Sequence, residues 1–276
     1  MPSLTFDTYG KTHVRLTQLR RNGTRHELVE LSAKILFRGD FTGSFTRADN
    51  SQILPTDTMK NTVYALARLH PVTVIEEFAR LLAHHFLDTV AQLEQVEVEL
   101  SQLPWSRIED HDSAFVLGGR EHRIARVIST KHSEQITSGV SGLEIIKTGK
   151  SAFSAFMKDR WTTLQETRDR LLGTVLDATW TYRSAPSDYT STCEHVRSCL
   201  LRAFAEHTSE SVQHTLFYMA QSALRSYNAL QEVHLVMPNK HRLLVDLTRF
   251  GLNNPNEIFV ATDEPSGYIE ARVSAD

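Results

Sequence analysis

The chain has 276 residues, of which 41% are hydrophobic and 23% are charged, and its formal net charge is −3. These values are typical of a globular protein with one large or two ordinary domains, and they argue against a nucleic-acid or anionic-membrane surface. No apolar run is long enough to cross a bilayer, and the N-terminal residues lack the pattern of a secretory signal.

The first 40 residues predict a β-hairpin. Residues 9–20 and 26–38 alternate between apolar and polar side chains, and the Asn-Gly pair in the intervening "RNGT" is a strong turn signal. Regular alternation along the first strand predicts one polar face made of Tyr9, Lys11, His13 and Arg15. Such a face is either solvent-exposed or lines a water-filled channel within an oligomeric barrel.

Helices and then further strands complete the first half of the chain. The segment 54–70 ends with helical character, and the T-x-x-E pattern from Thr73 to Glu76 predicts a capping box at the start of a second helix. Alternation returns at 95–100 and at 114–130. The first half therefore predicts the order β-β-α-α-β-β.

The second half repeats this order. We expect strands at 133–150, 177–183, 232–237 and 241–247. Capping boxes at Ser191–Glu194 and Thr163–Glu166 predict one helix of the repeat and one inserted helix, and a further helix is expected over 211–224. The pattern indicates an internal duplication, with units at 1–132 and 133–276, and an α+β fold in which each antiparallel sheet carries helices on one face. Closing the sheets around a ring would protect their edges.

The cysteines and histidines form no recognisable metal or redox motif. Cys193 and Cys199 are six residues apart in a helical stretch, which favours neither a disulfide framework nor a metal site. The thirteen histidines are scattered without a zinc-ligand spacing, and neither a GxGxxG nor a GxxxxGK[ST] loop is present. We therefore expect no metal and no nucleotide-type cofactor.

The segment "PNKHRLLVDL" at 238–247 places polar side chains at the mouth of an apolar strand. Because side chains alternate along a strand, Asn239 and His241 are expected to face the same side, followed by Leu243. The pair is either a hydrogen-bonded strand end or part of a pocket.

Six segments together resemble the urate oxidase (uricase) family. They are "YGKTHVRL" at 9–16, "LPTDTMKNTVYALA" at 54–67, "TTLQETRDRLLGT" at 162–174, "VQHTLFYMA" at 212–220, "PNKHRLLVDL" at 238–247 and "NPNEIFVATDEPSGYIEA" at 254–271. They occur in family order over nearly the whole chain. The resemblance implies two tandem tunnelling-fold (T-fold) units, a homotetramer that forms a hollow β-barrel, active sites between subunits, and no metal or organic cofactor.

The resemblance also implies catalytic residues. Lys11 resembles the lysine of the catalytic dyad, Thr56 its threonine partner, and His241 the third member of the proton relay. The backbone of Asp57 would help to hold the substrate, and Thr56 and Asp57 would come from the neighbouring chain.

Five further residues resemble the family's substrate-binding set. Phe153 would stack on the purine ring, while Arg170 would grip a substrate oxygen and ring nitrogen, as a planar guanidinium can with two parallel hydrogen bonds. Val212 and Gln213 would hold the other end of the substrate. Asn239 would lie over the ring at the oxygen or water site.

The activity implied by the resemblance is oxidation of urate by dioxygen to 5-hydroxyisourate and hydrogen peroxide, with urate itself supplying the electrons. The ending "VSAD" is not the peroxisomal tripeptide of eukaryotic members, so a bacterial cytoplasmic protein is expected. One alternative is another purine- or pterin-binding T-fold enzyme, although the zinc spacing common in that group is missing. Another is a ring-forming binding protein without chemistry, for which the Lys11, Thr56 and His241 set would have no use.

Overall fold

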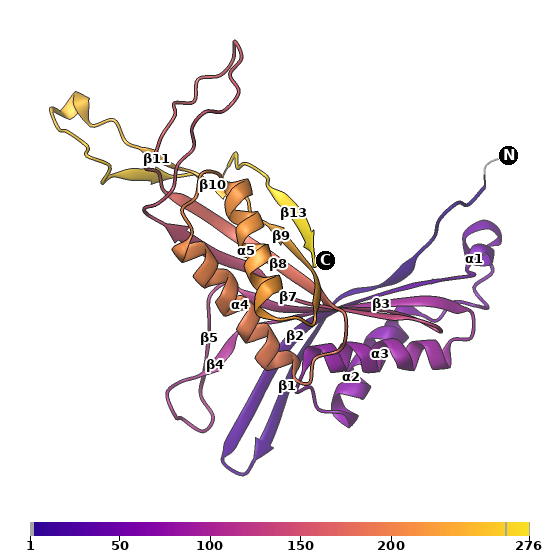
Figure 1. Cartoon of the computed structure of the whole chain (residues 1–276). Coiled ribbons are helices and arrows are strands. Elements are labelled where there is room, and N and C mark those ends of the chain that lie inside the picture. Colours follow the sequence, from indigo (N-terminus) through magenta and orange to yellow (C-terminus); the bar gives the residue numbers. More distant parts are fainter. Residues whose placement is uncertain (1–2, 263, 276) are drawn as a thin grey trace. The chain divides into compact units, whose positions relative to one another are not determined.

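The computed structural model describes residues 3–262 and 264–275, and the chain divides into two compact units (Figure 1). Unit 1 runs to Gly139 and includes Ala185–Thr190, whereas unit 2 comprises Val140–Ser184 and the residues from Ser191 onward. The tandem division into 1–132 and 133–276 stays a prediction. No helix within the described ranges is long and apolar enough to span a bilayer.

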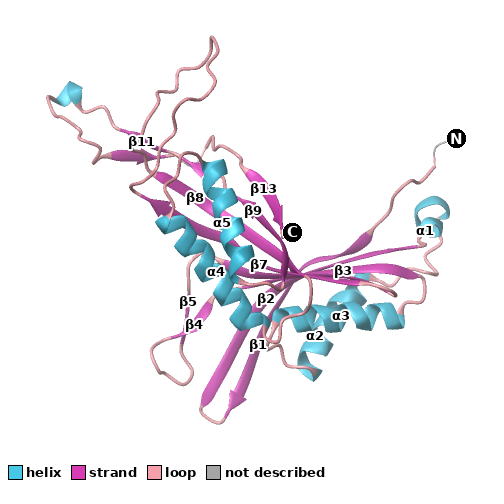
Figure 2. Ribbon diagram, in the orientation of Figure 1, coloured by secondary structure: helices cyan, strands magenta, loops and turns pink. Residues whose placement is uncertain are grey.

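Unit 1 has the expected order β-β-α-α-β-β, with antiparallel strands in the order β1-β2-β3-β6 (Figure 2). Its principal elements are β1 (Tyr9–Asn22), β2 (Arg25–Gly39), α2 (Thr56–Leu69), α3 (Ile75–Thr89), β3 (Leu93–Gln102) and β6 (His122–Thr130). A short helix and a small hairpin are added: α1 (Thr42–Arg47), β4 (Trp105–Arg107) and β5 (Phe115–Leu117). The core lies between the sheet and α2 and α3, where buried side chains such as Phe37, Phe78 and Val98 pack together.

Unit 2 repeats this arrangement, with strands in the order β7-β8-β9-β13. Its repeated elements are β7 (Glu134–Lys147), which begins in unit 1, β8 (Leu172–Tyr182), α4 (Tyr189–Glu206), α5 (Val212–Ser226), β9 (Leu230–Val236) and β13 (Glu270–Ser274). Between β9 and β13 lie β10 (Asn239–Lys240), β11 (Arg242–Leu244), the 3-10 helix η1 (Thr248–Phe250) and β12 (Phe259–Ala261). The predicted α+β class, with helices packed on antiparallel sheets, is confirmed.

The fourth strand of unit 2 was expected at 241–247, and this prediction is wrong. The strand that completes the sheet is β13, which pairs with β9. Residues Arg242–Leu244 pair instead with β12 in a separate two-stranded sheet. The side chains of Leu243 and Leu244 are 53% and 49% exposed, so this apolar run does not enter the core of the unit.

The capping box expected from Thr73 to Glu76 is also wrong. Helix α3 begins at Ile75 with Val74 as its N-cap, and no side chain makes a capping hydrogen bond. Glu76 is fully buried and accepts hydrogen bonds from Arg123 Nη2 (2.8 Å) and Ser138 Oγ (2.7 Å). The carboxylate therefore joins the helix to the sheet of unit 1 instead of turning back to its own N-terminus.

The other two capping boxes fail for different reasons. Helix α4 begins at Tyr189, so Ser191 lies inside its first turn. No helix begins at Thr163, because backbone hydrogen bonds in this region run to another segment: Phe153 N donates to Thr167 O (2.7 Å), and Thr167 N donates to Phe153 O (3.0 Å). The helix expected over 211–224 is confirmed as α5.

The predicted common polar face of β1 is interrupted by a β-bulge. The register with β2 shifts between Lys11 and Val14, and His13 adopts a left-handed conformation with φ of 56°. An extra residue in one strand reverses which face the following side chains occupy. Tyr9 and Lys11 therefore lie on the helix-covered face, as the packing of Tyr9 on two core phenylalanines shows, whereas Arg15 lies on the opposite face.

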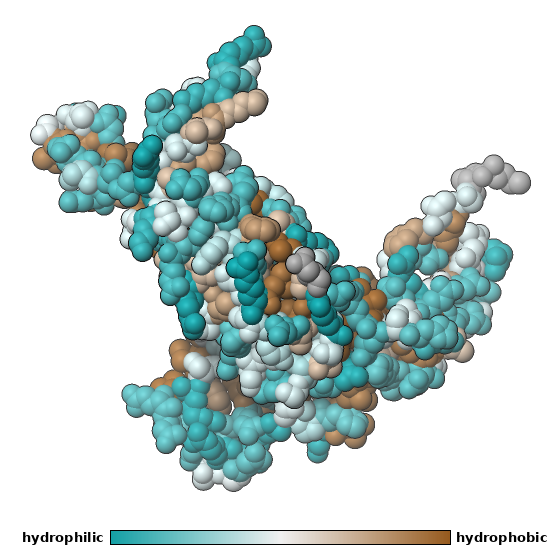
Figure 3. All heavy atoms as spheres, viewed as in Figure 1, coloured by the Kyte–Doolittle hydropathy of each residue, from teal (hydrophilic) through white to brown (hydrophobic). Residues whose placement is uncertain are grey.

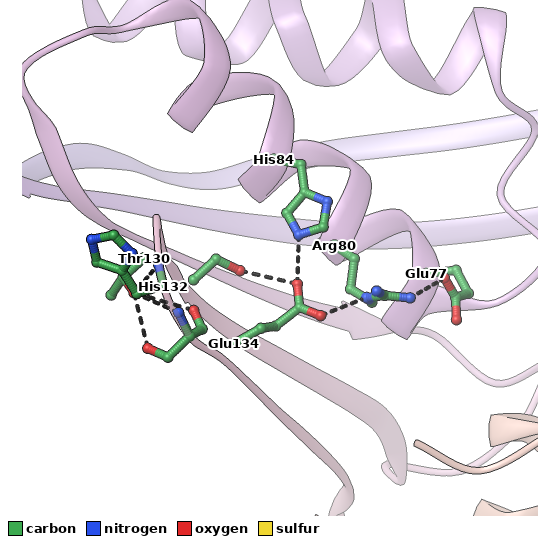
Figure 4. A network of polar contacts seen from close by, with 8 residues as sticks. Glu77, Arg80, His84, Thr130, His132 and Glu134 are labelled. Carbon is green, nitrogen blue, oxygen red and sulfur yellow. Dashed lines mark hydrogen bonds and ion pairs between the residues drawn. The ribbon is translucent and has the colours of Figure 1, made fainter. Parts of the chain in front are cut away.

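A polar network ties α3 to the start of β7 within unit 1 (Figure 4). Glu134 accepts hydrogen bonds from Arg80 Nε (2.8 Å) and Ser129 Oγ (3.2 Å), and its other contact is with His84 Nε2 (2.7 Å). Partial burial raises the pKa of Glu134, but Arg80 and His84 outweigh it and the pKa is lowered. Arg80 also pairs with Glu77 (3.1 Å) on its own helix.

Candidate active site

A pocket of about 340 Å³ in unit 2 brings together six of the nine residues predicted for the site. These six are Phe153, Arg170, Val212, Gln213, Asn239 and His241. The lining also contains Leu243, which was expected on the same side as Asn239 and His241, and residues that the sequence did not single out: Leu164, Gln165, Thr167, Leu171, Arg242, Gly267 and Ile269. The volume is within the usual range for a small-molecule site.

Phe153 is fixed by backbone bonds on both sides. Its own N–H and C=O pair with Thr167, and the N–H of Ala152 donates to Ser209 O (2.7 Å). The ring of Phe156 stacks on that of Phe153, with centroids 4.9 Å apart and planes 14° from parallel. Phe153 is therefore a fixed aromatic platform at the pocket wall, although its predicted role of stacking on a purine stays a prediction.

Arg170 is the pocket residue whose environment most clearly indicates a bound ligand. Its backbone N–H donates to Ser151 O (3.0 Å), and its guanidinium carbon lies 5.2 Å from the centroid of the Phe153 ring. The Nε and Nη2 atoms are buried and have no hydrogen-bond partner among the described residues. Burial lowers the pKa of this arginine. A buried cation with unused donors is costly unless a ligand meets it, and a planar anionic ligand would satisfy both donors.

The N-terminus of α5 supplies a second set of donors. Ser211 is the N-cap, and its hydroxyl accepts from His214 N (3.1 Å). The first intrahelical bond runs from Thr215 N to Ser211 O (3.1 Å), so the N–H groups of Val212 and Gln213 have no partner within the helix. Helix N-termini favour negatively charged or electron-rich groups, and the amide of Gln213 adds both a donor and an acceptor.

Asn239 and His241 both line the pocket, which is one of the two alternatives expected for this pair. Asn239 pairs with Thr174 of β8, and its N–H donates to Gly267 O (2.8 Å). The carbonyl of His241 accepts from Thr262 N (3.1 Å). Both residues are therefore positioned through their backbones, which leaves the side chains toward the cavity.

The remaining three predicted residues, Lys11, Thr56 and Asp57, lie in unit 1. The Leu54 N–H donates to Tyr9 Oη (3.1 Å), a contact that ties β1 to the segment preceding α2. Hydrogen bonding from Lys60 and the positive charges of Lys60 and Lys11 lower the pKa of Asp57. Lys11 is therefore close enough to the start of α2 to act electrostatically on its first turn.

The first turn of α2 has free backbone donors. Its first bond runs from Met59 N to Pro55 O (3.2 Å), so the N–H groups of Thr56 and Asp57 have no partner within the helix.

The sequence did not reveal the part played by Gly10, where a Cβ atom would lie 1.9 Å from the carbonyl oxygen of Ile35. Glycine is required there because β2 approaches the strand that carries Lys11 so closely.

A second cavity, of about 480 Å³, lies in unit 1 but contains none of the predicted residues. It is lined by charged groups that pair with one another, such as Lys34 and Glu99 at 3.5 Å. Although it is larger, we assign the site to the unit 2 pocket, because only that pocket holds buried donors without partners. Within the described ranges, no three His, Cys, Asp or Glu side chains gather as metal ligands.

The chain is similar to known proteins over nearly its whole length. The family model described as "Uricase" matches residues 7–128 and 136–270. The chain is 41% identical to the uricase of Arthrobacter globiformis over 269 residues, covering 97% of this chain and 88% of that protein. It is 34% identical to the uricase of Dictyostelium discoideum over 280 residues, covering 99% and 98%. The crystal structure of the Arthrobacter globiformis uricase has a TM-score of 0.96 and 39% identity, covering 100% of this chain and 96% of that chain.

Proposed function

Because this chain belongs to the uricase family, we propose that it oxidises urate with dioxygen and water to 5-hydroxyisourate and hydrogen peroxide. The observation that carries the proposal is the unit 2 pocket, in which Arg170 keeps two buried donors unused beside a fixed aromatic ring. Urate is flat, conjugated and anionic near neutral pH, so it suits both features.

We infer that Arg170 and Gln213 hold opposite edges of the substrate. The guanidinium of Arg170 would make two parallel hydrogen bonds to an oxygen and a ring nitrogen. The side chain of Gln213 and the N–H of Val212 would meet the other edge, and Phe153 would stack on the ring. Asn239 would lie over the ring, where dioxygen and later water react.

Proton removal is assigned to a relay of Lys11, Thr56 and His241. The electrons come from urate, so the tasks of the chain are to orient the substrate, to remove its protons and to exclude water. Lys11 would accept a proton through the hydroxyl of Thr56, and His241 would pass protons onward. No organic cofactor or metal takes part in this scheme.

The complete site is proposed to form in a homotetramer, with Thr56 and Asp57 contributed by the neighbouring chain. Two extensions of unit 2 carry large apolar side chains that a single chain leaves exposed: the loop 154–166 and the arm formed by β11, η1 and β12. Figure 3 shows hydrophobic residues among hydrophilic ones on this arm. Met157 is 91% exposed, Trp161 74% and Phe250 67%. We infer that these side chains are buried against neighbouring subunits in the assembly.

The direct test is oxidation by purified protein treated with a metal chelator. We expect loss of the near-ultraviolet absorbance of urate, with one peroxide formed for each urate consumed. Lys11→Met and Thr56→Ala should each lose most of the rate while anaerobic urate binding survives. Binding of a pterin in preference to urate, without peroxide formation, would instead indicate another T-fold enzyme.

A further inference from the structure

Arg242 is a second arginine in the pocket, and no role is assigned to it by the scheme above. It lies on β11 directly after His241, lines the same cavity, and its side chain is only 20% exposed. Its Nη1 donates to the carbonyl oxygen of His241 (3.2 Å). Within the described ranges it pairs with one carboxylate, that of Glu144 on β7, whose Oε1 lies 3.9 Å from Nη2 and whose side chain is 57% exposed.

The charges of the pocket are one-sided. Among the described residues that line it are Arg170 and Arg242, but no aspartate or glutamate of the described ranges. Glu144 lies outside the lining. Its contact with Arg242 is long and its own side chain is largely exposed, so it compensates little of the positive charge of Arg242. The pocket wall therefore carries two positive charges, of which Arg170 alone has unused buried donors.

The proposed reaction needs two positive charges at different stages. Urate enters as an anion, which one guanidinium can balance. Removal of a further proton places a second negative charge on the same ring system, and this charge must be stabilised before electrons pass to dioxygen. A preorganised positive charge stabilises the bound anion and stabilises the doubly charged species further, so it lowers the barrier to the second proton loss as well as tightening binding.

We propose that Arg242 stabilises the negative charge that develops when bound urate loses its second proton, with its guanidinium held in place by the carbonyl of His241. This inference rests on the proposed urate oxidation. Arg242 acts at a distance through the field in the pocket, whereas Arg170 binds the substrate directly. Loss of the Arg242 charge should therefore lower kcat and weaken binding by similar factors, whereas Arg170→Lys, which keeps the charge, should act mainly on binding.

The test compares Arg242→Gln with Arg242→Lys by steady-state kinetics and anaerobic urate titration. At an effective dielectric constant of about 20, loss of one charge within a pocket of this size lowers kcat by about ten- to a hundredfold. The anaerobic dissociation constant should rise by a similar factor, because the same field acts on the bound urate monoanion. Arg242→Lys keeps the charge and should retain most of the rate.

Two further variants separate the charge from local structure. Arg272→Gln is the matched control: Arg272 is also on a strand of unit 2 and pairs with Glu232 (3.3 Å), but it does not line the pocket. It should leave kcat unchanged. Glu144→Gln removes the counter-charge of Arg242, so kcat should stay constant or rise.

The pH–rate profile provides an independent readout. Among the described residues, the charged and titratable groups that contact Arg242 or share its pocket include Glu144 on β7, His241 beside it and Arg170. Without the Arg242 charge the second proton of bound urate is harder to remove, so the rate of Arg242→Gln should rise at higher pH than that of the wild type.

The outcomes distinguish this inference from the proposed function. If the wild-type chain does not oxidise urate, the proposed function fails. If the wild type is active, the inference is overturned when Arg242→Gln matches Arg272→Gln, when Arg242→Lys loses as much rate as Arg242→Gln, or when Glu144→Gln shows the same loss. Should Arg242→Gln fail to fold, the lysine variant and Glu144→Gln decide between the same alternatives.

Discussion

Replacement of Glu76 by glutamine should lower the free energy of unfolding by about 3 kcal/mol. Each carboxylate oxygen has its own donor, Ser138 on Oε1 and Arg123 on Oε2, and the residue is fully buried. Glutamine has the same shape but only one acceptor oxygen, so it leaves Arg123 or Ser138 facing an amide N–H and removes the counter-charge. Breaking a buried ion pair typically costs about 3–5 kcal/mol. The lower end applies because Arg123 retains a bond to Thr190 (3.1 Å) and is 19% exposed.

Calorimetry can measure this change. For 276 residues, an unfolding entropy of about 2.1 cal/mol/K per residue converts about 3 kcal/mol into a fall in Tm of about 5 °C. The matched control is Glu77→Gln on the same helix, because Glu77 is 52% exposed and its pair with Arg80 is worth at most about 0.5 kcal/mol. If both variants melted at the same temperature, the assignment of a stabilising buried pair to Glu76 would be refuted.

Three further predictions concern the strand of Lys11, the sheet of unit 2 and the substrate anchor. Gly10→Ala should destabilise the chain by about 1–3 kcal/mol in thermal melts, because its Cβ would meet the Ile35 carbonyl at 1.9 Å. Hydrogen bonding from Tyr268, and to a lesser extent from His234, lowers the pKa of Glu270. The stabilising contribution of the Glu270 carboxylate is therefore complete above the ordinary pKa of 4.5 and is lost as the pH falls through the lowered value. The Tm difference between the wild type and Glu270→Gln should accordingly shrink as the pH falls below 4.5. Arg170→Lys should weaken anaerobic urate binding by about tenfold, because lysine cannot form the paired hydrogen bonds.

Each of these predictions has a control or a contradicting result. Gly149→Ala adds a Cβ with nothing within 4 Å, so it should be tolerated, and equal melting of the Gly10 and Gly149 variants would contradict the steric argument. Arg168→Lys changes an exposed arginine two residues from Arg170 and should leave urate binding intact. A pH-independent Tm difference for Glu270→Gln would show that its bonded carboxylate does not contribute through ionisation.

The sequence predicted those elements in which local pattern and tertiary packing agree. The Asn-Gly turn joins β1 and β2 as expected, with Gly23 at φ of 63°, and Ser211 caps α5. The predicted boxes at Glu76 and Thr163 failed because tertiary partners took the groups concerned: Glu76 binds Arg123, and Thr167 pairs with Phe153. A short capping motif carries no information about such distant partners.

Residues of the site could be predicted where they lie in segments that resemble the family, and not where their position depends on tertiary structure. The resemblance pointed to Arg170 and Gln213, which both line the pocket, but the capping box at Thr163–Glu166 predicted a helix in the segment that leads to Arg170, and this helix does not form. The bulge at His13, which reverses the faces of β1, has no signal in the alternation itself. Arg242 was also missed, because strict alternation directs it away from His241, whereas its long side chain turns back to the His241 carbonyl.

The claim that the site is assembled from two chains is tested most directly by mixing two inactive variants. Thr56→Ala and Arg170→Gln each disable every site in a pure assembly. If each site takes Thr56 from one chain and Arg170 from its neighbour, co-expressed mixtures regain about a quarter of the wild-type activity, because random pairing across a two-fold interface leaves some sites intact. Mixed assemblies that stay as inactive as either variant alone would contradict the account.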